Sequence, residues 1–158
     1  MLHSDPITGI KILSPLADHK SRVLILDTVP GEKSRIMLQY YVNKSNNFWR
    51  IMFQALREPY HPDYKMKKQM LLKNGIALWN VLVEEIPYEQ PNDFQTFFQM
   101  HSTVTRIIFN GNQAAECYNR HIGHRSGILY TTLPSTSSLN TWKSFEEKAE
   151  VWSHELRK

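Results

Sequence analysis

The sequence contains a single cysteine, Cys117, among 158 residues. One thiol cannot form a disulfide within the chain, and zinc or iron–sulfur sites built from four thiolates are excluded. Long apolar runs are also missing: the longest, residues 75–83, is interrupted by Asn80 and is less than half the length of a membrane span. No charged-then-apolar signal pattern opens the sequence. We therefore expect a soluble protein of a reducing compartment, the cytoplasm.

Neither sign of charge dominates the composition. Nineteen Lys and Arg against fifteen Asp and Glu give a net charge of +4. This mild excess suits a polyanionic partner, but an ordinary soluble surface explains it equally well. With 41% hydrophobic and 11% aromatic residues, the chain can build a core without disulfides or bound metal ions. Disordered and fibrous proteins are therefore excluded. The length and the lack of internal repeats predict one domain, residues 1–158, acting as a monomer.

Four short runs are rich in Val, Ile, Leu and aromatic residues: 22–27, 75–80, 105–110 and 128–133. Each is apolar on successive residues and does not alternate, which is typical of a strand covered by helices on both faces. We therefore predict a parallel sheet.

Helical patterns lie between and after these runs. The clearest is an apolar stripe at helical spacing: Phe145, Ala149, Trp152 and Leu156. Ser144 and Glu147 form a capping box that fixes where this helix begins. Further helices are expected over about residues 48–55, from Pro62 at its first position to Lys73, and after Asn92, with the aromatics at 94, 97 and 98 buried. The alternation predicts a three-layer α/β/α sandwich with a central, mainly parallel, four-stranded sheet.

Polar side chains follow the predicted strands, where such sheets bind ligands. Asn80 and Asn110 end the second and third strands, and a Pro-Ser-Thr-Ser loop follows the fourth. A primary amide can read the edge of a nucleobase, and an aromatic ring beside it offers a stacking face. Hydroxyls and backbone N–H groups suit phosphate oxygens. These strand ends therefore indicate a nucleotide or nucleic-acid site.

Six segments that follow one another along the chain carry a family resemblance: PGEKS, QYYVNKSNNFWRIM, GIALWNVL, PNDF, FNG and LPSTSSLN. Together they resemble the uracil-DNA glycosylase superfamily, most closely its mismatch-specific and hypoxanthine-DNA glycosylase branches. The resemblance covers residues 22–157 and leaves 1–21 as an N-terminal extension. It implies a three-layer α/β fold and a monofunctional DNA repair glycosylase, which hydrolyses the N-glycosidic bond of a flipped uracil or hypoxanthine without a cofactor or metal.

The resemblance also implies roles for individual residues. Asn46 becomes the catalytic candidate, which would position water or polarise the base, and Tyr41 the ring on which the base stacks. Asn80 would read the edge of the base. The other base-binding candidates are Thr28, Pro30 and Gly31. The candidates for DNA contact are Lys33, Ser34, Lys44, Pro134, Ser135, Thr136, Ser137, Leu139 and Asn140.

Three positions depart from the family pattern. Asp27 stands where the family has glycine, and a carboxylate there would add bulk and charge beside the base. Val29 replaces the catalytic asparagine of the mismatch-specific branch. Residues 43–45 replace the His-Pro-Xaa of the family pattern. These changes keep open a non-cleaving module that binds damaged DNA or a nucleotide, and a hydrolase of free nucleosides. If Asp27 faces the pocket, it could instead orient the attacking water.

Each candidate also has a purely structural interpretation. Asn46 could cap a helix, Tyr41 could be an ordinary packed aromatic, Asn80 could bond its own backbone, and the serines after Pro134 could form a polar turn. Phe48, Trp49, Phe97, Trp142 and Trp152 are expected in the core. Cys117, His121 and His124 would share one helix face, a conceivable zinc site, but three ligands without a fourth fit surface histidines better.

Overall fold

The computed structural model describes residues 2–4 and 11–158. Its centre is a parallel sheet of four strands, β3 (Val23–Asp27), β4 (Ile76–Asn80), β7 (Arg106–Asn110) and β8 (Leu129–Leu133). They lie in the order β4-β3-β7-β8, and every neighbouring pair is parallel. Each strand begins one residue after its apolar run and ends with it. The predicted four-stranded parallel sheet is confirmed.

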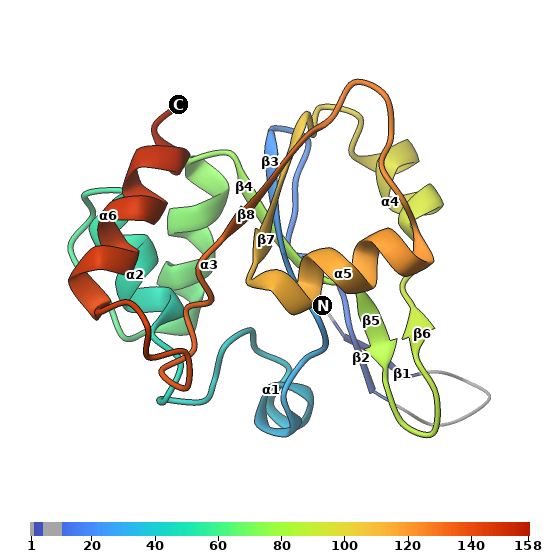
Figure 1. Ribbon diagram of the computed structural model, residues 1–158, viewed down its shortest axis with the longest axis horizontal. Helices are drawn as coiled ribbons and strands as arrows, with labels where there is room; N and C mark the ends of the chain where they lie inside the picture. The colour runs from blue at the N-terminus through green and yellow to red at the C-terminus, as the bar shows by residue number, and fades with distance from the viewer. Residues whose placement is uncertain (1, 5–10) are drawn as a thin grey trace.

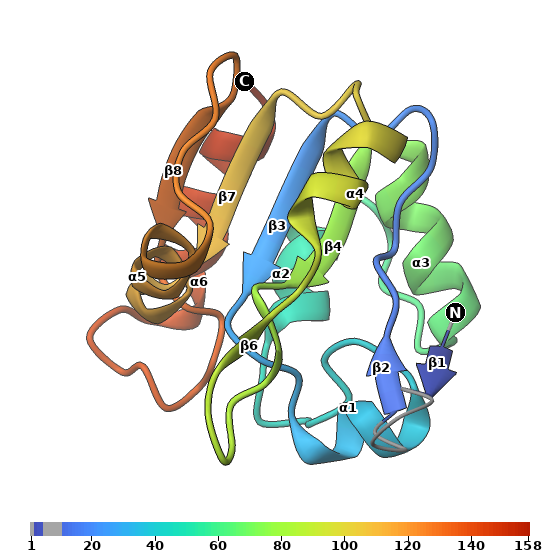
Figure 2. The same cartoon turned by 90° about the vertical axis from the view of Figure 1, so that its right-hand side faces the viewer.

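Helices cover both faces of the sheet (Figures 1 and 2). One layer holds α2 (Phe48–Ala55), α3 (Tyr64–Lys73) and α6 (Phe145–Leu156), and the other holds α4 (Phe94–Met100) and α5 (Asn112–His121). Side chains of β3 alternate between the layers, since Val23 and Ile25 join the core beneath α2 and α6, while Leu24 and Leu26 join the core beneath α4 and α5. This two-sided burial explains the apolar runs of β3, β4 and β7 and confirms the three-layer sandwich. The edge strand β8, which was also expected to be covered on both faces, is buried only at Leu133.

Shorter elements complete the fold: α1 (Glu32–Met37), the antiparallel pair β1 (Leu2–Ser4) and β2 (Lys11–Leu13), and the hairpin of β5 (Leu82–Glu84) and β6 (Gln90–Pro91). The segment expected as an extension packs on the domain. Leu16 forms a bridge with Leu78 of β4, and the Tyr40 hydroxyl donates to the carbonyl oxygen of Ser14 at 2.6 Å. In the described part of the chain, no helix combines the length and the apolarity that a membrane crossing requires.

The helix ends show how well caps can be predicted. Ser144 opens α6 with the expected capping box, in which its side chain accepts from Glu147 N and the Glu147 side chain accepts from Ser144 N. The expected start of α3 at Pro62 is two residues early, because the side chain of Asp63 accepts from Lys65 N and makes Asp63 the N-cap.

Two other expectations are wrong. His124 does not continue the helical face of Cys117 and His121, because α5 ends at His121 and Gly123 follows with φ of 84°. The His124 ring stacks on Tyr130 instead, with ring centroids 3.8 Å apart. Trp142 does not lie in the core: it is 74% exposed, on the loop that leads to α6.

Candidate functional site

A cleft of about 230 Å³ opens at the carboxyl ends of β3 and β4. It offers roughly the space of eight water molecules, which suits one flat ring system. Tyr41, Asn46 and Asn80 all line it, although they come from three separate segments. Other predicted residues in its wall are Pro30, Gly31, Ser34, Ser137 and Leu139. The residues expected to surround a base are therefore brought together.

The remaining candidates lie around this cleft. Lys44 lines a neighbouring hollow that also holds Arg50 and Lys67. Pro134, Ser135 and Asn140 line another hollow, together with Trp142 and Lys143. Lys33 is exposed on α1, and Thr28 donates its backbone N–H to the Asp27 carboxylate. Thr136 is fully buried, so its hydroxyl faces the protein interior.

Tyr41 is held in one position by contacts on its ring and its hydroxyl. Its backbone has φ of 56°, in the left-handed region that side chains rarely adopt. The ring stacks on Phe48 with centroids 4.0 Å apart and planes 12° apart. The hydroxyl donates to Asp27 Oδ2 at 2.9 Å and accepts from Asn110 Nδ2 at 2.9 Å. Tyr41 is thus a packed aromatic and at the same time a fixed wall of the cleft.

A chain of hydrogen bonds continues from Tyr41 to Asn46. Asn110 Nδ2 also donates to Thr136 Oγ1 at 2.9 Å, and Asn110 Oδ1 accepts from Thr136 N at 2.9 Å. The Thr136 hydroxyl in turn donates to Asn46 Oδ1 at 2.7 Å. Asn110 was absent from the predicted site residues, although its position at a strand end was noted. Its buried amide connects the stacking ring to the catalytic candidate.

The Asn46 side chain has its two ends in different environments. Its Oδ1 accepts from Phe48 N at 3.0 Å and from Thr136 Oγ1, so the oxygen is fully engaged within the protein. The bond from Phe48 N closes a turn just before α2, whose N-cap is the neighbouring Asn47, so the helix-cap interpretation of Asn46 is wrong. Among the described residues the amide nitrogen has no partner, and the residue lines the cleft. Asn46 can therefore hold the turn before α2 and still present a donor to a ligand.

Asn80 presents an unsatisfied acceptor. The residue is 5% exposed, and its Oδ1 is buried without a hydrogen-bond partner among the described residues. Its backbone oxygen is already satisfied by Asn92 Nδ2 at 2.8 Å, so the Asn80 amide does not serve its own backbone. A buried acceptor without a donor is costly, and such groups mark places where a ligand can supply one.

Asp27, the last residue of β3, lies in the wall of the cleft. Its Oδ1 accepts from Thr28 N at 2.8 Å and its Oδ2 from the Tyr41 hydroxyl. Burial raises the pKa of this carboxyl above its usual value, while the two hydrogen bonds oppose the shift. The side chain is thus held against the wall by two donors, one at each oxygen.

The loop after β8 is fastened to the domain from several sides. Thr136 O accepts from Asn47 N at 3.0 Å, and Ser45 O accepts from Ser138 N at 3.1 Å. The buried Lys148 donates from Nζ to the carbonyl oxygens of Ser137 and Asn140, at 2.9 and 2.6 Å. Lys148 was not predicted, since nothing in its local sequence distinguishes it. These bonds leave Leu139, 89% exposed, at the mouth of the cleft.

Gly111 permits the close approach of this loop to β7. It has φ of 93°, and a Cβ on it would lie 3.1 Å from Ser135 Cβ. A side chain there would push the loop away from Asn110. The FNG segment therefore matters for its glycine as well as for its amide.

Comparison with known proteins identifies the family of this chain. Residues 15–154 match the family described as the uracil DNA glycosylase superfamily. The chain belongs to the uracil DNA glycosylase superfamily. A hypoxanthine DNA glycosylase of Methanosarcina acetivorans is 31% identical over 145 residues, which cover 84% of this chain and 89% of that protein. A hypoxanthine DNA glycosylase of Methanosarcina barkeri is 26% identical over 156 residues, covering 91% and 96%.

A solved structure of the superfamily shares the fold. The solution NMR structure of a candidate uracil DNA glycosylase from Methanosarcina acetivorans superposes with a TM-score of 0.76. The two chains are 30% identical, and the match covers 92% of this chain and 95% of the other. The family resemblance drawn from the six sequence segments is confirmed, and with it the α/β sandwich expected of a DNA glycosylase.

Thr136 offers a test of how the Asn46 amide is oriented. Thr136→Val keeps the shape but removes the hydroxyl that bonds Asn46 Oδ1 and Asn110 Nδ2. Because two buried groups lose a partner, we expect a loss of about 1–3 kcal/mol in unfolding free energy and a decrease in single-turnover base release of up to about tenfold. Denaturant unfolding and rapid-quench kinetics measure the two effects. The exposed Ser138→Ala is the control, and a Thr136→Val protein with unchanged kinetics would contradict the orienting role.

Asp27 predicts a specific dependence of stability on pH. Burial raises the pKa of this carboxyl in the folded chain above its value in the unfolded chain. Its contribution to stability is therefore fully present at pH values below the pKa of the unfolded chain, and it is lost as the pH rises through the pKa of the folded chain. Asp27→Asn does not titrate, so its stability relative to the natural protein should increase over this interval. Thermal unfolding of both proteins from about pH 3 to about pH 7 measures the difference. Parallel curves would show that the carboxyl does not titrate abnormally.

Proposed function

We propose that this chain is a monofunctional DNA N-glycosylase that hydrolyses the glycosidic bond of a flipped, deaminated base, uracil or hypoxanthine. The observation that carries the proposal is the convergence of the Tyr41 ring and the amides of Asn46 and Asn80 on one cleft. Relatives that are 26 and 31% identical over most of the chain carry the name hypoxanthine DNA glycosylase, which supports a DNA substrate. The damaged base would leave the duplex and enter the cleft.

The unpaired acceptor of Asn80 favours a deaminated base. Deamination converts cytosine N3 and adenine N1, which are acceptors, into the N–H donors of uracil N3 and hypoxanthine N1. The buried Oδ1 of Asn80 can accept from such a donor, whereas the lone pair on N3 of cytosine or N1 of adenine, the parent bases, would oppose it. A site built around one hydrogen bond rejects ligands that cannot form it. Tyr41 would hold the ring by stacking, a contact that serves pyrimidines and purines alike.

The chemistry requires donors near the departing base. Cleavage of the glycosidic bond develops oxocarbenium character on the sugar and negative charge on the base. The free amide nitrogen of Asn46 would donate to that charge, because its oxygen is already engaged by Phe48 and Thr136. The backbone N–H groups of residues 31–33 lie at the start of α1, beside the same cleft. Water would complete the hydrolysis at the sugar.

DNA would approach along the rim of the cleft. Lys33 and Lys44 are exposed there, and Ser135, Ser137 and Asn140 offer short polar groups for phosphates. Lys148 fastens the loop that carries these last three residues, because its Nζ donates to the carbonyl oxygens of Ser137 and Asn140. We propose that the buried Thr136 orients Asn46 from within this loop. The exposed Leu139 would enter the space that the flipped base leaves in the duplex.

Leu139→Ala tests this role. Without the exposed leucine a duplex refills the gap more easily, so we expect activity on double-stranded substrate to fall about tenfold, in keeping with a transfer free energy of about 1.5–3 kcal/mol for a leucine side chain. Single-stranded substrate has no gap to refill and should be cleaved at nearly the natural rate. Equal losses on both substrates would contradict the wedge.

The proposed function is tested with duplexes carrying uracil, hypoxanthine or xanthine. Strand breaks after alkali would support the glycosylase. Retention of damaged DNA without breaks would support the second candidate, a non-cleaving module, which is favoured by the carboxyl group of Asp27 in the cleft wall. Release of base from free nucleosides, with no salt dependence, would indicate a nucleoside hydrolase, since phosphate contacts make DNA binding sensitive to salt.

A further inference from the structure

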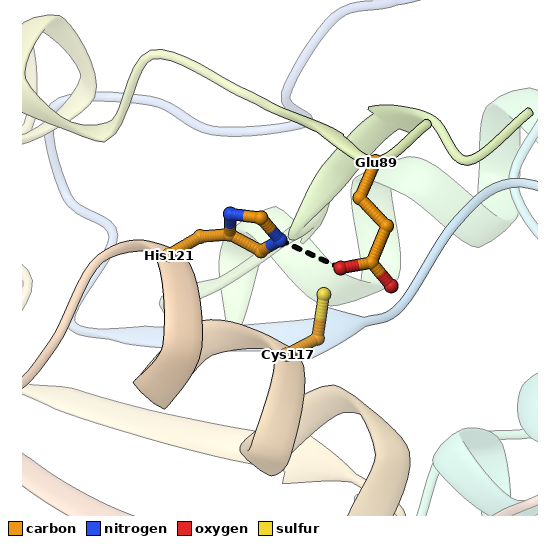
Figure 3. A group of neighbouring side chains, drawn as sticks. All are labelled: Glu89, Cys117 and His121. Atoms are coloured by element: carbon orange, nitrogen blue, oxygen red, sulfur yellow. Dashed lines mark hydrogen bonds and ion pairs between the residues drawn. The ribbon is translucent and has the colours of Figure 1, made fainter. Parts of the chain in front are cut away.

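A second cluster of reactive side chains lies outside the cleft. Glu89, Cys117 and His121 each offer one ligand atom, and the three atoms lie within 4.8 Å of one another (Figure 3). Cys117 and His121 are one turn apart on α5, while Glu89 reaches them from the turn between β5 and β6. None of the three lines the cleft. From the sequence, Cys117, His121 and His124 formed a conceivable zinc site, although surface histidines were the favoured interpretation; the structure brings Glu89, and not His124, to the other two.

We propose that Glu89, Cys117 and His121 bind a zinc ion, with water as the fourth ligand. Thiolate, imidazole and carboxylate are the three ligand types that zinc accepts in proteins. Tetrahedral zinc with bonds of about 2.0–2.3 Å separates its ligand atoms by roughly 3.3 to 3.7 Å. The ligand atoms already lie within 4.8 Å, and His121 Nε2 is 2.7 Å from Glu89 Oε1. Side-chain movements of about 1 Å would therefore form the site without moving the backbone.

Arg120 fits the proposed site as a supporting group. Its guanidinium donates to Glu89 Oε1 at 2.8 Å and to Oε2 at 3.0 Å. When Oε1 turns to the metal, Oε2 can keep its bond to Arg120. Such outer partners orient metal ligands and raise their affinity. The ion pair therefore holds the carboxylate near the position that the metal requires.

The protons balance in a simple way. Burial and the nearby Glu89 raise the pKa of the Cys117 thiol, so the thiol keeps its proton near neutral pH without metal. Zinc binding replaces this proton, which passes to solvent. Zinc also displaces the proton on His121 Nε2, which exchanges with solvent as the ring takes up its other tautomer, and the hydrogen bond between His121 and Glu89 gives way to bonds to the metal. His121 then binds through Nε2 as the neutral imidazole with its proton on Nδ1.

The ion would fasten the hairpin that follows Asn80 to helix α5. Without metal, this hairpin is tied there by the ion pair of Glu89 with Arg120 and the hydrogen bond of Glu89 with His121, which are partly exposed. Exposed ion pairs contribute little to stability, whereas a metal ion that binds only the folded chain stabilises the fold by mass action. The inference does not depend on the proposed glycosylase activity.

Metal titration of the full chain tests the proposal. After treatment with a chelator, we expect the protein to bind one zinc ion in calorimetry near neutral pH and to unfold at a higher temperature with zinc. Cobalt should produce a thiolate-to-metal charge-transfer band, which Cys117→Ser abolishes. Glu89→Gln and His121→Ala should each lower zinc affinity about a hundredfold or more, since even outer partners contribute about 10- to 100-fold.

Matched controls separate the site from loose surface binding. Glu85→Gln changes an exposed carboxylate of the same hairpin, and His124→Ala removes the histidine that stacks on Tyr130. Both should bind zinc as the natural chain does. No saturable zinc binding, or binding that survives Glu89→Gln and His121→Ala, would overturn the proposal. Circular dichroism confirms that each variant is folded.

Discussion

Asn46→Ala is expected to lower the rate of base release by about 10²- to 10³-fold, the usual effect of removing one donor from a site that stabilises developing charge. The expectation follows from the two ends of the amide. Its oxygen is engaged by Phe48 N and Thr136 Oγ1, so only the nitrogen is free to act on the substrate. Single-turnover kinetics with a hypoxanthine or uracil duplex measure the loss.

Two further variants decide what the loss means. Asn47→Ala removes the neighbouring amide, which makes no side-chain cap on α2, and should leave the rate unchanged. Asn46→Asp keeps an acceptor for Phe48 and Thr136 but replaces the donor, so we expect a loss as large as that of alanine. Full activity of Asn46→Asp would indicate that the residue activates water through an oxygen, and full activity of Asn46→Ala would remove it from the mechanism.

Three strands of the sheet could be predicted because burial on both faces imposes apolar residues on successive positions of β3, β4 and β7. The fourth strand, β8, lies at the edge of the sheet and is buried only at Leu133, so its β-branched and aromatic residues reflect strand propensity and not two-sided burial. Helix α6 could also be predicted, since its capping box and its apolar stripe both lie within its own short stretch of sequence. Pro62 and His124 were misplaced for the opposite reason: a competing cap at Asp63 and the turn at Gly123 decide those ends.

The candidate site was predicted only in part. The amides of Asn46 and Asn80 and the ring of Tyr41 were found through strand ends and family segments, and the cleft brings all three together. The bonds that fix them join residues far apart in the sequence: Asn110 meets Thr136 across 26 positions, and Asp27 meets Tyr41 across 14. No local pattern reports such pairs. Trp142 was assigned to the core because aromatic residues are usually buried, and nothing local shows that its loop lies outside.

The cost of burying the Asp27 carboxyl group is offset by two hydrogen bonds. In place of the glycine of the family pattern, this chain has a carboxyl group that would be costly to bury alone. The Tyr41 hydroxyl and Thr28 N each donate to one of its oxygens. Asp27 thereby fixes the ring on which we propose that the base stacks.

Asn80→Leu is expected to lower kcat/KM on uracil and hypoxanthine duplexes by about 10- to 100-fold, because one well-placed base contact contributes about 1–3 kcal/mol. Leucine has nearly the shape of asparagine but no acceptor for the N–H that deamination creates. The buried Oδ1 has no other partner among the described residues, so its removal costs the free protein no hydrogen bond. Stability measured by denaturant unfolding should therefore hardly change.

The exposed Asn119, near the C-terminal end of α5, provides the matched control. Asn119→Leu should cleave both duplexes at the natural rate, and Asn80→Leu should bind an undamaged duplex as tightly as the natural chain, since the flipped base is not part of that complex. A variant that retains full kcat/KM, or that loses affinity for undamaged DNA to the same extent, would show that Asn80 does not read the base. A loss confined to damaged duplexes would assign the discrimination between a deaminated base and its parent to this one buried oxygen.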